Sequence, residues 1–287
     1  MFNRKVLKAR AKFVLSRSFL MSVVACAIVS IITGGMLNFG TQRLQDINLA
    51  AMSDLRIIAI YAVIGLMFLV GIAISIFVAE PLKVGLCHFM LRSADMDANL
   101  DNLIYPFRNN YKNIVLVTFI KNLYIGLWSL LGFIPLVIAF WKFGLAEKIA
   151  ELLPMVQNES VTATMSLTTI SSVLVLATVI FMIPAYIKQL QYSMVGYILA
   201  ENPNMSVSKA IGKSKEMMVG NKWGYVKLAI SFFGWYFIAS TACCIGNFLL
   251  APYIEQTFAQ MYLEISGQGK DYSGYTYQTT FDNFGNM

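Results

Sequence analysis

Few residues of this 287-residue chain have the types and spacing that chemistry in a protein requires. The single histidine, His88, follows one cysteine and has no second metal ligand or catalytic partner beside it. The four cysteines form no Cys-x-x-Cys pair, so neither a zinc site nor a disulfide framework is indicated. Nucleophile-elbow, phosphate-loop and zinc-protease motifs are absent. The sequence therefore predicts that the protein is not an enzyme and has no catalytic, cofactor-binding or metal-binding residues.

Glu255 is the one carboxylate that stands out by its position. It adjoins Gln256 and follows Pro252 by three residues, inside an apolar block near the C-terminus. An ionisable residue at membrane depth is costly and often functional. Lys121 and Lys188 also approach membrane depth, but their long side chains can reach the interface. Glu255 is thus the candidate for a transport pathway, and the alternative is an interfacial residue near a helix end.

A second acidic segment, residues 95–101, has the carboxylate spacing of the first half of a calcium loop. Leu100 stands where that loop requires glycine, and Pro106 stands where it requires a bidentate glutamate. We therefore expect a solvated acidic turn at this position.

The composition indicates a membrane protein. Apolar residues make up 57% of the chain and charged residues 13%, against about 25% charged in average soluble domains. The mean hydropathy is +0.64, and a soluble protein of this size could not hide so much apolar surface. These values exclude a soluble enzyme, a disordered chain and a secreted disulfide scaffold. They predict an all-α, polytopic transmembrane helical bundle.

The apolar runs define the expected spans. The last apolar block, residues 222–264, is long enough for either one span or two, so the residues allow five or six helices. We expect one transmembrane helical domain over residues 1–265, an outer loop at 141–167 and a disordered tail at 266–287. With the last block divided, the spans are about 19–37, 57–79, 114–140, 169–199, 222–243 and 245–264.

The basic residues give the orientation. Taken in chain order around the first four spans and the last block, the Lys+Arg counts are 6, 2, 5, 2, 6 and 1. Cytoplasmic segments carry the excess of Lys and Arg, so the N-terminus is expected in the cytoplasm. We attribute the net charge of +7 to basic residues that orient the protein in the membrane and contact anionic lipid headgroups, so no nucleic-acid partner is expected.

A basic amphipathic helix is expected at residues 206–219, on the cytoplasmic side. Lys209, Lys213 and Lys215 lie off its apolar face. One interpretation is a helix lying on anionic lipid that helps to set the topology. The other is a docking surface for a lipid headgroup or a partner protein.

Several motifs resemble a bacterial membrane family, domain of unknown function 975. The resemblance covers roughly residues 103–263 and includes Leu127–Leu131, Tyr192–Met194, Tyr197 to Asn202 and Pro203, Ser231–Trp235, Pro252–Tyr253 and Tyr262. About 50 residues separate the first two motifs here, whereas the family joins them almost directly, so the outer loop looks like an insertion. The resemblance implies a compact bundle of six helices with a cytoplasmic tail.

The resemblance implies no activity, because the family's function is not established. The predicted function is a non-enzymatic scaffold, sensor or accessory factor in envelope maintenance, or in peptide export and self-protection. The predicted location is the bacterial plasma membrane, and the predicted partners are anionic lipid headgroups and an unidentified membrane protein. The alternative is a small solute or ion transporter or channel with Glu255 in the pathway.

Overall fold

The structure is a computed structural model that describes residues 2–38, 54–142, 144–157, 161–241 and 245–269. Throughout these residues the secondary structure is helical, with turns and no strand, so the expected all-helical fold is confirmed. The chain groups into two compact units by its internal contacts. Unit 1 contains the described residues up to Phe119 and those from Met194 onward, and unit 2 is Ile120–Ser193.

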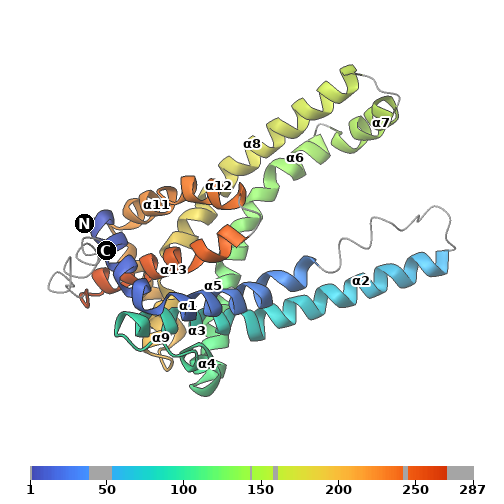
Figure 1. Cartoon of the computed structure of the whole chain (residues 1–287). Helices are drawn as coiled ribbons and strands as arrows, with labels where there is room; N and C mark the ends of the chain where they lie inside the picture. The colour runs from blue at the N-terminus through green and yellow to red at the C-terminus, as the bar shows by residue number, and fades with distance from the viewer. Residues whose placement is uncertain (1, 39–53, 143, 158–160, 242–244, 270–287) are drawn as a thin grey trace. The chain divides into compact units, whose positions relative to one another are not determined.

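Unit 1 contains most of the helices, and α5 is shared between the two units (Figure 1). Its elements are α1 (Arg4–Asn38), α2 (Asp54–Ile74), the π-helical turn η3 (Ser75–Ala79), α3 (Glu80–Ala94), α4 (Asp101–Arg108), the first half of α5 (Tyr111–Ser129), α9 (Val195–Glu201), α10 (Val207–Met218), α11 (Lys222–Ile230), α12 (Phe233–Thr241) and α13 (Ile245–Ile265). Unit 2 contains the rest of α5, the 3-10 turn η4 (Leu130–Phe133), α6 (Ile134–Lys142), α7 (Leu145–Gln157) and α8 (Val161–Gln191).

Four helical stretches among the described residues are long and apolar enough to cross a membrane. The stretches Arg4–Thr33, Ile58–Ala94, Tyr111–Lys142 and Thr164–Glu201 each contain most or all of one of the first four expected spans. Large apolar side chains on α2 and α8 are exposed, for example Phe68 at 66% and Leu176 at 64%. Lipid would cover such surfaces, because water penalises contiguous apolar area of this extent.

The last apolar block is divided differently from the sequence expectation. The stretch expected as one span at 222–243 forms the two short helices α11 and α12, with a break at Ser231 and Phe232. The Lys8 Nζ donates a hydrogen bond of 3.5 Å to the Ser231 carbonyl, which gives this oxygen a partner outside its own helix. Helix α13 occupies the position of the sixth expected span. The expected turn at Cys243–Cys244 and the tail from residue 270 lie outside the described residues.

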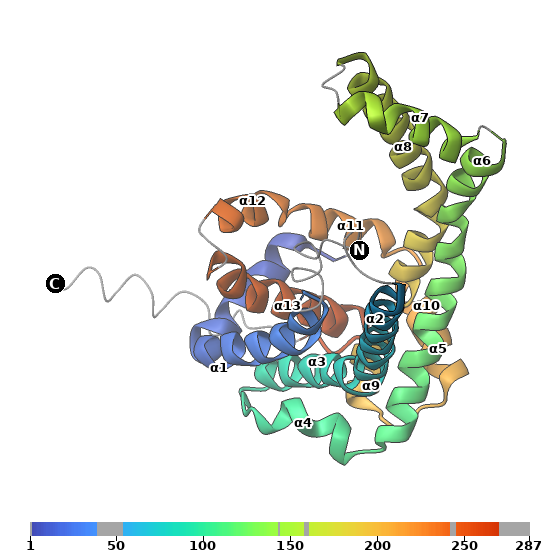
Figure 2. The same ribbon diagram turned by 90° about the vertical axis from the view of Figure 1, so that its right-hand side faces the viewer.

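Helices α1, α3 and α13 form the core of unit 1. Each of the three packs against the other two, and α1 packs most extensively on α13 (Figure 2). At one end of this pair, Arg10 Nη1 lies 2.6 Å from Glu264 Oε2. Helix α1 is kinked at Ser18, where φ is −128° and the side-chain hydroxyl donates a hydrogen bond to the Val14 carbonyl. The buried stripe of α1 includes Leu7, Ala11, Val14, Ser18, Ser22, Ala25 and Cys26.

Helix α4 lies directly against α3, and Gly85 permits this close approach. A Cβ atom at Gly85 would stand 2.0 Å from the Leu103 carbonyl oxygen, which belongs to the backbone of α4. Since a backbone atom cannot move aside as a flexible side chain can, only glycine fits at this position.

The substitution Gly85→Ala is therefore expected to destabilise unit 1 by about 1–3 kcal/mol, the usual cost of overpacking. The measurement is the apparent unfolding midpoint of the purified protein in mild detergent. Gly71→Ala is the matched control, since nothing lies within 4 Å of a Cβ at Gly71. Equal midpoints for the two variants would contradict the assigned contact between α3 and α4.

Candidate functional site

Glu255, the carboxylate selected from the sequence, lies on α13 within unit 1 and is half-buried. Its charge acts on Lys83 of α3, which also pairs with Glu80 at 2.8 Å. The same charge acts on Cys26 of α1 and on Tyr197 of α9. Glu255 is thus close enough to groups on three other helices for its charge to act on them, whereas the Lys83 ammonium forms its ion pair with Glu80.

Two glutamines beside Glu255 are buried without hydrogen bonds. Gln256 and Gln260 are one helical turn apart on α13, and both side chains are 0% exposed. Neither amide has a partner for its nitrogen or its oxygen, and the hydroxyl of buried Ser22 on α1 has none either. Because burying an unpaired polar group costs about 1–3 kcal/mol, these five atoms need a structural or functional reason.

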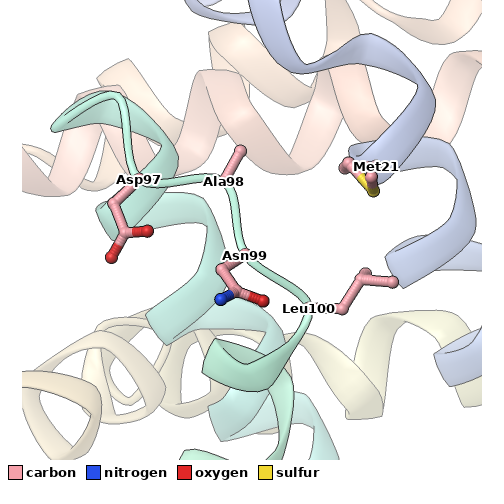
Figure 3. Close-up of a pocket in the computed structure, with 5 residues that line it drawn as sticks. All are labelled: Met21, Asp97, Ala98, Asn99 and Leu100. Atoms are coloured by element: carbon pink, nitrogen blue, oxygen red, sulfur yellow. The ribbon is translucent and has the colours of Figure 1, made fainter.

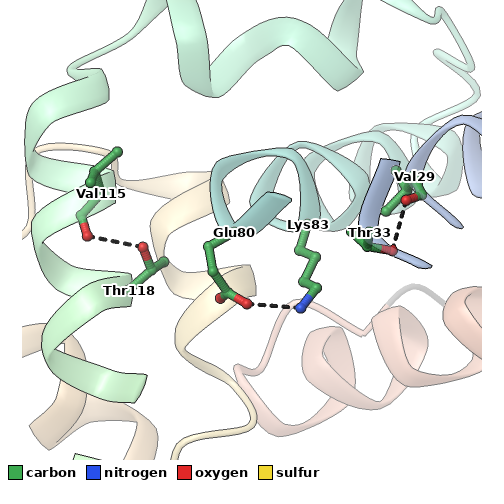
Figure 4. A network of polar contacts seen from close by, with 6 residues as sticks. All are labelled: Val29, Thr33, Glu80, Lys83, Val115 and Thr118. Carbon is green, nitrogen blue, oxygen red and sulfur yellow. Dashed lines mark hydrogen bonds and ion pairs between the residues drawn. The ribbon is translucent and has the colours of Figure 1, made fainter. Parts of the chain in front are cut away.

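Other hydroxyl groups near the core have their bonds satisfied. Thr33 donates to the Val29 carbonyl at 2.8 Å, and Thr118 donates to the Val115 carbonyl (Figure 4). Thr118 also donates to the Ile114 carbonyl at 2.8 Å. Each is a bond from a side chain to its own helix, a common way for a buried threonine to be satisfied. The glutamine amides and Ser22 therefore differ from the remaining polar groups of the core.

The motif that resembles the family joins helices of unit 1. The Tyr197 ring stacks on Tyr262 of α13 at 5.2 Å between centroids, and the Tyr262 hydroxyl donates a 2.6 Å hydrogen bond to Glu201. One residue earlier, the Ala200 carbonyl lies 2.9 Å from His88 Nδ1 of α3. The His88 ring also stacks on Tyr105 of α4 at 3.8 Å. The only histidine of the chain is thus held between three helices.

The end of the same motif is bound to α5. Asn202 is the C-cap residue of α9, and the chain turns at Pro203. Asn113 Nδ2 donates to the Pro203 carbonyl at 2.7 Å and to the Met205 carbonyl at 2.9 Å. Asn202 and Pro203 therefore shape a turn whose carbonyls are satisfied by a neighbouring helix.

The other residues selected from the sequence lie in different places. Pro252 and Tyr253 lie on α13, with Pro252 buried and the Tyr253 ring edge-on to Phe232 at 5.5 Å. Trp235 on α12 is 56% exposed. Tyr192 follows α8 in unit 2 and is buried. Within unit 1 the structure brings Pro252 and Tyr253 together with Glu255 on one helix.

The basic helix expected at 206–219 is α10, but its apolar face is not free for lipid. Ala210, Ile211, Ser214 and Met218 are all buried in the protein. Lys209 and Lys215 are exposed and Lys213 is half-exposed. The helix therefore uses its apolar face for packing within unit 1, and the side that faces outward includes Lys209 and Lys215.

The acidic turn expected at residues 95–101 joins α3 to α4. It borders a shallow hollow of about 380 Å³ that Met21 of α1 also lines (Figure 3). The Asn99 side chain accepts the Asp101 backbone N–H at 3.0 Å, and Asn102 donates to the Asp97 carbonyl. Across the described ranges, no group of three or more His, Cys, Asp or Glu side chains could hold a metal ion.

Sequence reasoning noted the polar residues Gln256 and Gln260, but it missed that their buried amides have no hydrogen-bond partner among the described residues and that Tyr262 bonds to Glu201. Two glutamines four residues apart in an apolar helix were the available signal for a polar face directed into protein. Nothing in the sequence indicates the hydrogen bond from Tyr262 to Glu201, because the two residues are 61 positions apart and lie on different helices.

Two substitutions on α13 are expected to have opposite effects on stability. Gln260→Leu removes a buried amide that bonds nothing, so the unfolding midpoint in mild detergent should stay unchanged or rise. Tyr262→Phe leaves the Glu201 carboxylate without its 2.6 Å donor and should cost about 1–3 kcal/mol. A Gln260→Leu protein as destabilised as Tyr262→Phe would mean that the amide binds water or an ion.

The sequence matches the model of a known protein family over nearly its whole length. The model for "Protein of unknown function (DUF975)" matches residues 1–269, which is wider than the range of 103–263 expected from the sequence motifs. No curated protein and no solved structure gives a significant match. Since the family match covers nearly the whole chain, the protein belongs to the DUF975 family of proteins of unknown function.

Proposed function

We propose that this chain is a multi-pass protein of the bacterial plasma membrane that performs no chemical reaction. It acts as a scaffold, sensor or accessory factor in envelope maintenance or in peptide export and self-protection. The supporting observation is that His88 and Glu201, groups suited to catalysis by type, are held by bonds between helices. A general acid or base needs a proton-exchanging partner in a substrate site, and these two groups support packing instead.

The lysines of α10 support a role at the cytoplasmic face. Their helix has its apolar face buried within unit 1, so Lys209, Lys213 and Lys215 can bind anionic headgroups or an acidic partner without leaving the protein. The N-terminal segment, with six basic residues before the first span, belongs to the same face. Partner recovery by pull-down in mild detergent, from wild type and from the triple Lys→Gln variant, tests this role.

Accessibility labelling in intact cells tests the proposed topology. Single cysteines are introduced at Asn3, Gln157 and Ser273 in a variant without the four native cysteines. The six-helix arrangement predicts that an impermeant maleimide reaches only the cysteine at 157. Labelling at 273 as well would favour five helices, and labelling at 3 would contradict the cytoplasmic N-terminus.

A second candidate function is transport of a small solute or ion. It is favoured by a half-buried carboxylate whose charge acts on Lys83, next to two buried amides that bond nothing. Polar groups of this kind inside a membrane bundle commonly belong to a substrate or ion pathway.

Flux into proteoliposomes distinguishes the two functions. If Glu255 couples transport, Glu255→Gln should reduce uptake at least tenfold while the apparent unfolding midpoint changes little. Glu264→Gln is the control, because that carboxylate pairs with Arg10 at the end of α13. Uptake that is equal in wild type and Glu255→Gln would remove Glu255 from the pathway, and absence of uptake would favour the non-transporting function.

A further inference from the structure

A surface groove of about 400 Å³ lies between α1, α12 and α13 in unit 1. Its wall on α1 includes Lys12 and Phe19, and its other walls include Trp235, Leu249 and Tyr253. Neither Glu255 nor the buried glutamines line it. The groove is therefore separate from the polar face of α13 described above.

One end of the groove is positively charged. Arg4, Lys8 and Lys12 recur every four residues on α1, and the three charges interact electrostatically. None of the described acidic residues lines the groove, and Glu264 on the same pair of helices is already paired with Arg10. Lys12 is exposed and forms no hydrogen bond or ion pair within the described part of the chain. An anion at this end would relieve the repulsion among the three charges.

Lys8, one helical turn before Lys12, contacts an aromatic ring that packs against the groove residue Tyr253. Lys8 Nζ lies 4.3 Å from the centre of the Phe232 ring and bonds to the Ser231 carbonyl. Phe232 in turn packs against the Tyr253 ring. The wall residue Tyr253 is thus held by Phe232, which Lys8 contacts, whereas Lys12 lines the groove itself and remains available for a ligand.

The rest of the groove is apolar and exposed. Phe19 is 44% exposed, Leu249 is 47% exposed and Trp235 is 56% exposed. Lys12 and Phe19 are seven residues apart, which corresponds to ~10 Å along a helix. That distance matches the step from a lipid phosphate to its upper acyl chain, and Trp and Tyr are common at this depth.

We propose that this groove binds one molecule of an anionic phospholipid. The headgroup phosphate lies at Lys12, and an acyl chain lies along Phe19, Leu249 and Leu250. The inference rests on the membrane location proposed above, but it assigns a defined lipid site separate from the lysines of α10. The charge of α1 at one end and the apolar wall at the other fit an amphipathic anion better than a soluble one.

Native mass spectrometry of the full-length protein in detergent micelles tests the site, with titrations of phosphatidylglycerol and phosphatidylcholine. Wild type should bind a first phosphatidylglycerol more tightly than phosphatidylcholine. Lys12→Gln should weaken that binding about fivefold, the effect of one lysine charge near a headgroup. Lys12→Arg should retain it, and Leu250→Trp should abolish it by filling the groove.

Lys112→Gln, at an exposed position on α5, is the matched control and should bind the first lipid as wild type does. Equal affinity for the two lipids, or unchanged binding in both Lys12→Gln and Leu250→Trp, would overturn the proposal. So would a loss in Lys112→Gln as large as that in Lys12→Gln. If Leu250→Trp unfolds, Lys12→Glu at the exposed position decides instead. Recovery of the chain from the soluble fraction would contradict the proposed function, whereas a membrane-bound chain without the lipid preference contradicts only the groove.

Discussion

The packing of α1 on α13 is the interaction on which the rest of unit 1 depends. Small residues such as Ala11, Ser22 and Ala25 in the buried stripe of α1 let neighbouring backbones approach closely. The pair of Arg10 and Glu264 fixes one end of the two helices. Because α3 contacts both helices, their register also positions α3 and the α4 helix that lies on it. In lipid, such van der Waals contacts replace the hydrophobic driving force available in water.

The second constraint is the satisfaction of polar groups away from water. The hydroxyls of Thr33 and Thr118 meet it within their own helices, and the hydroxyl of Tyr262 meets it across helices at Glu201. Gln256 and Gln260 do not meet it, although both are fully buried. A bundle built only for support would lose nothing by having leucine at these positions. The two amides are therefore the feature of α13 that favours a ligand-binding or transport role.

The all-helical fold and the first four apolar stretches followed from composition and hydropathy, since a long uncharged run has few alternatives to a helix in lipid. The break at Ser231 did not follow, and the Ser231 carbonyl there accepts a hydrogen bond from Lys8, a residue 223 positions away. The apolar face of α10 was recognised, but neither interpretation offered for this helix, a position on lipid or a docking surface, included the packing of that face within the protein. Amphipathic spacing shows that one face must be covered and does not specify by what. Glu255 was found because a lone carboxylate in an apolar block is visible in sequence, whereas its proximity to Lys83 required the fold.

One motif through which the chain resembles its family, Tyr197 to Pro203, joins α9 to other helices. Tyr197 stacks on Tyr262, Glu201 accepts the Tyr262 hydroxyl, and the Pro203 carbonyl receives Asn113. Contacts of this kind hold a fold together, and a shared architecture does not by itself specify an activity. The features that could distinguish one function from another lie outside this motif, on the polar face of α13 and in the groove beside Lys12. Experiments on function therefore belong at those two places, with motif variants serving as probes of stability.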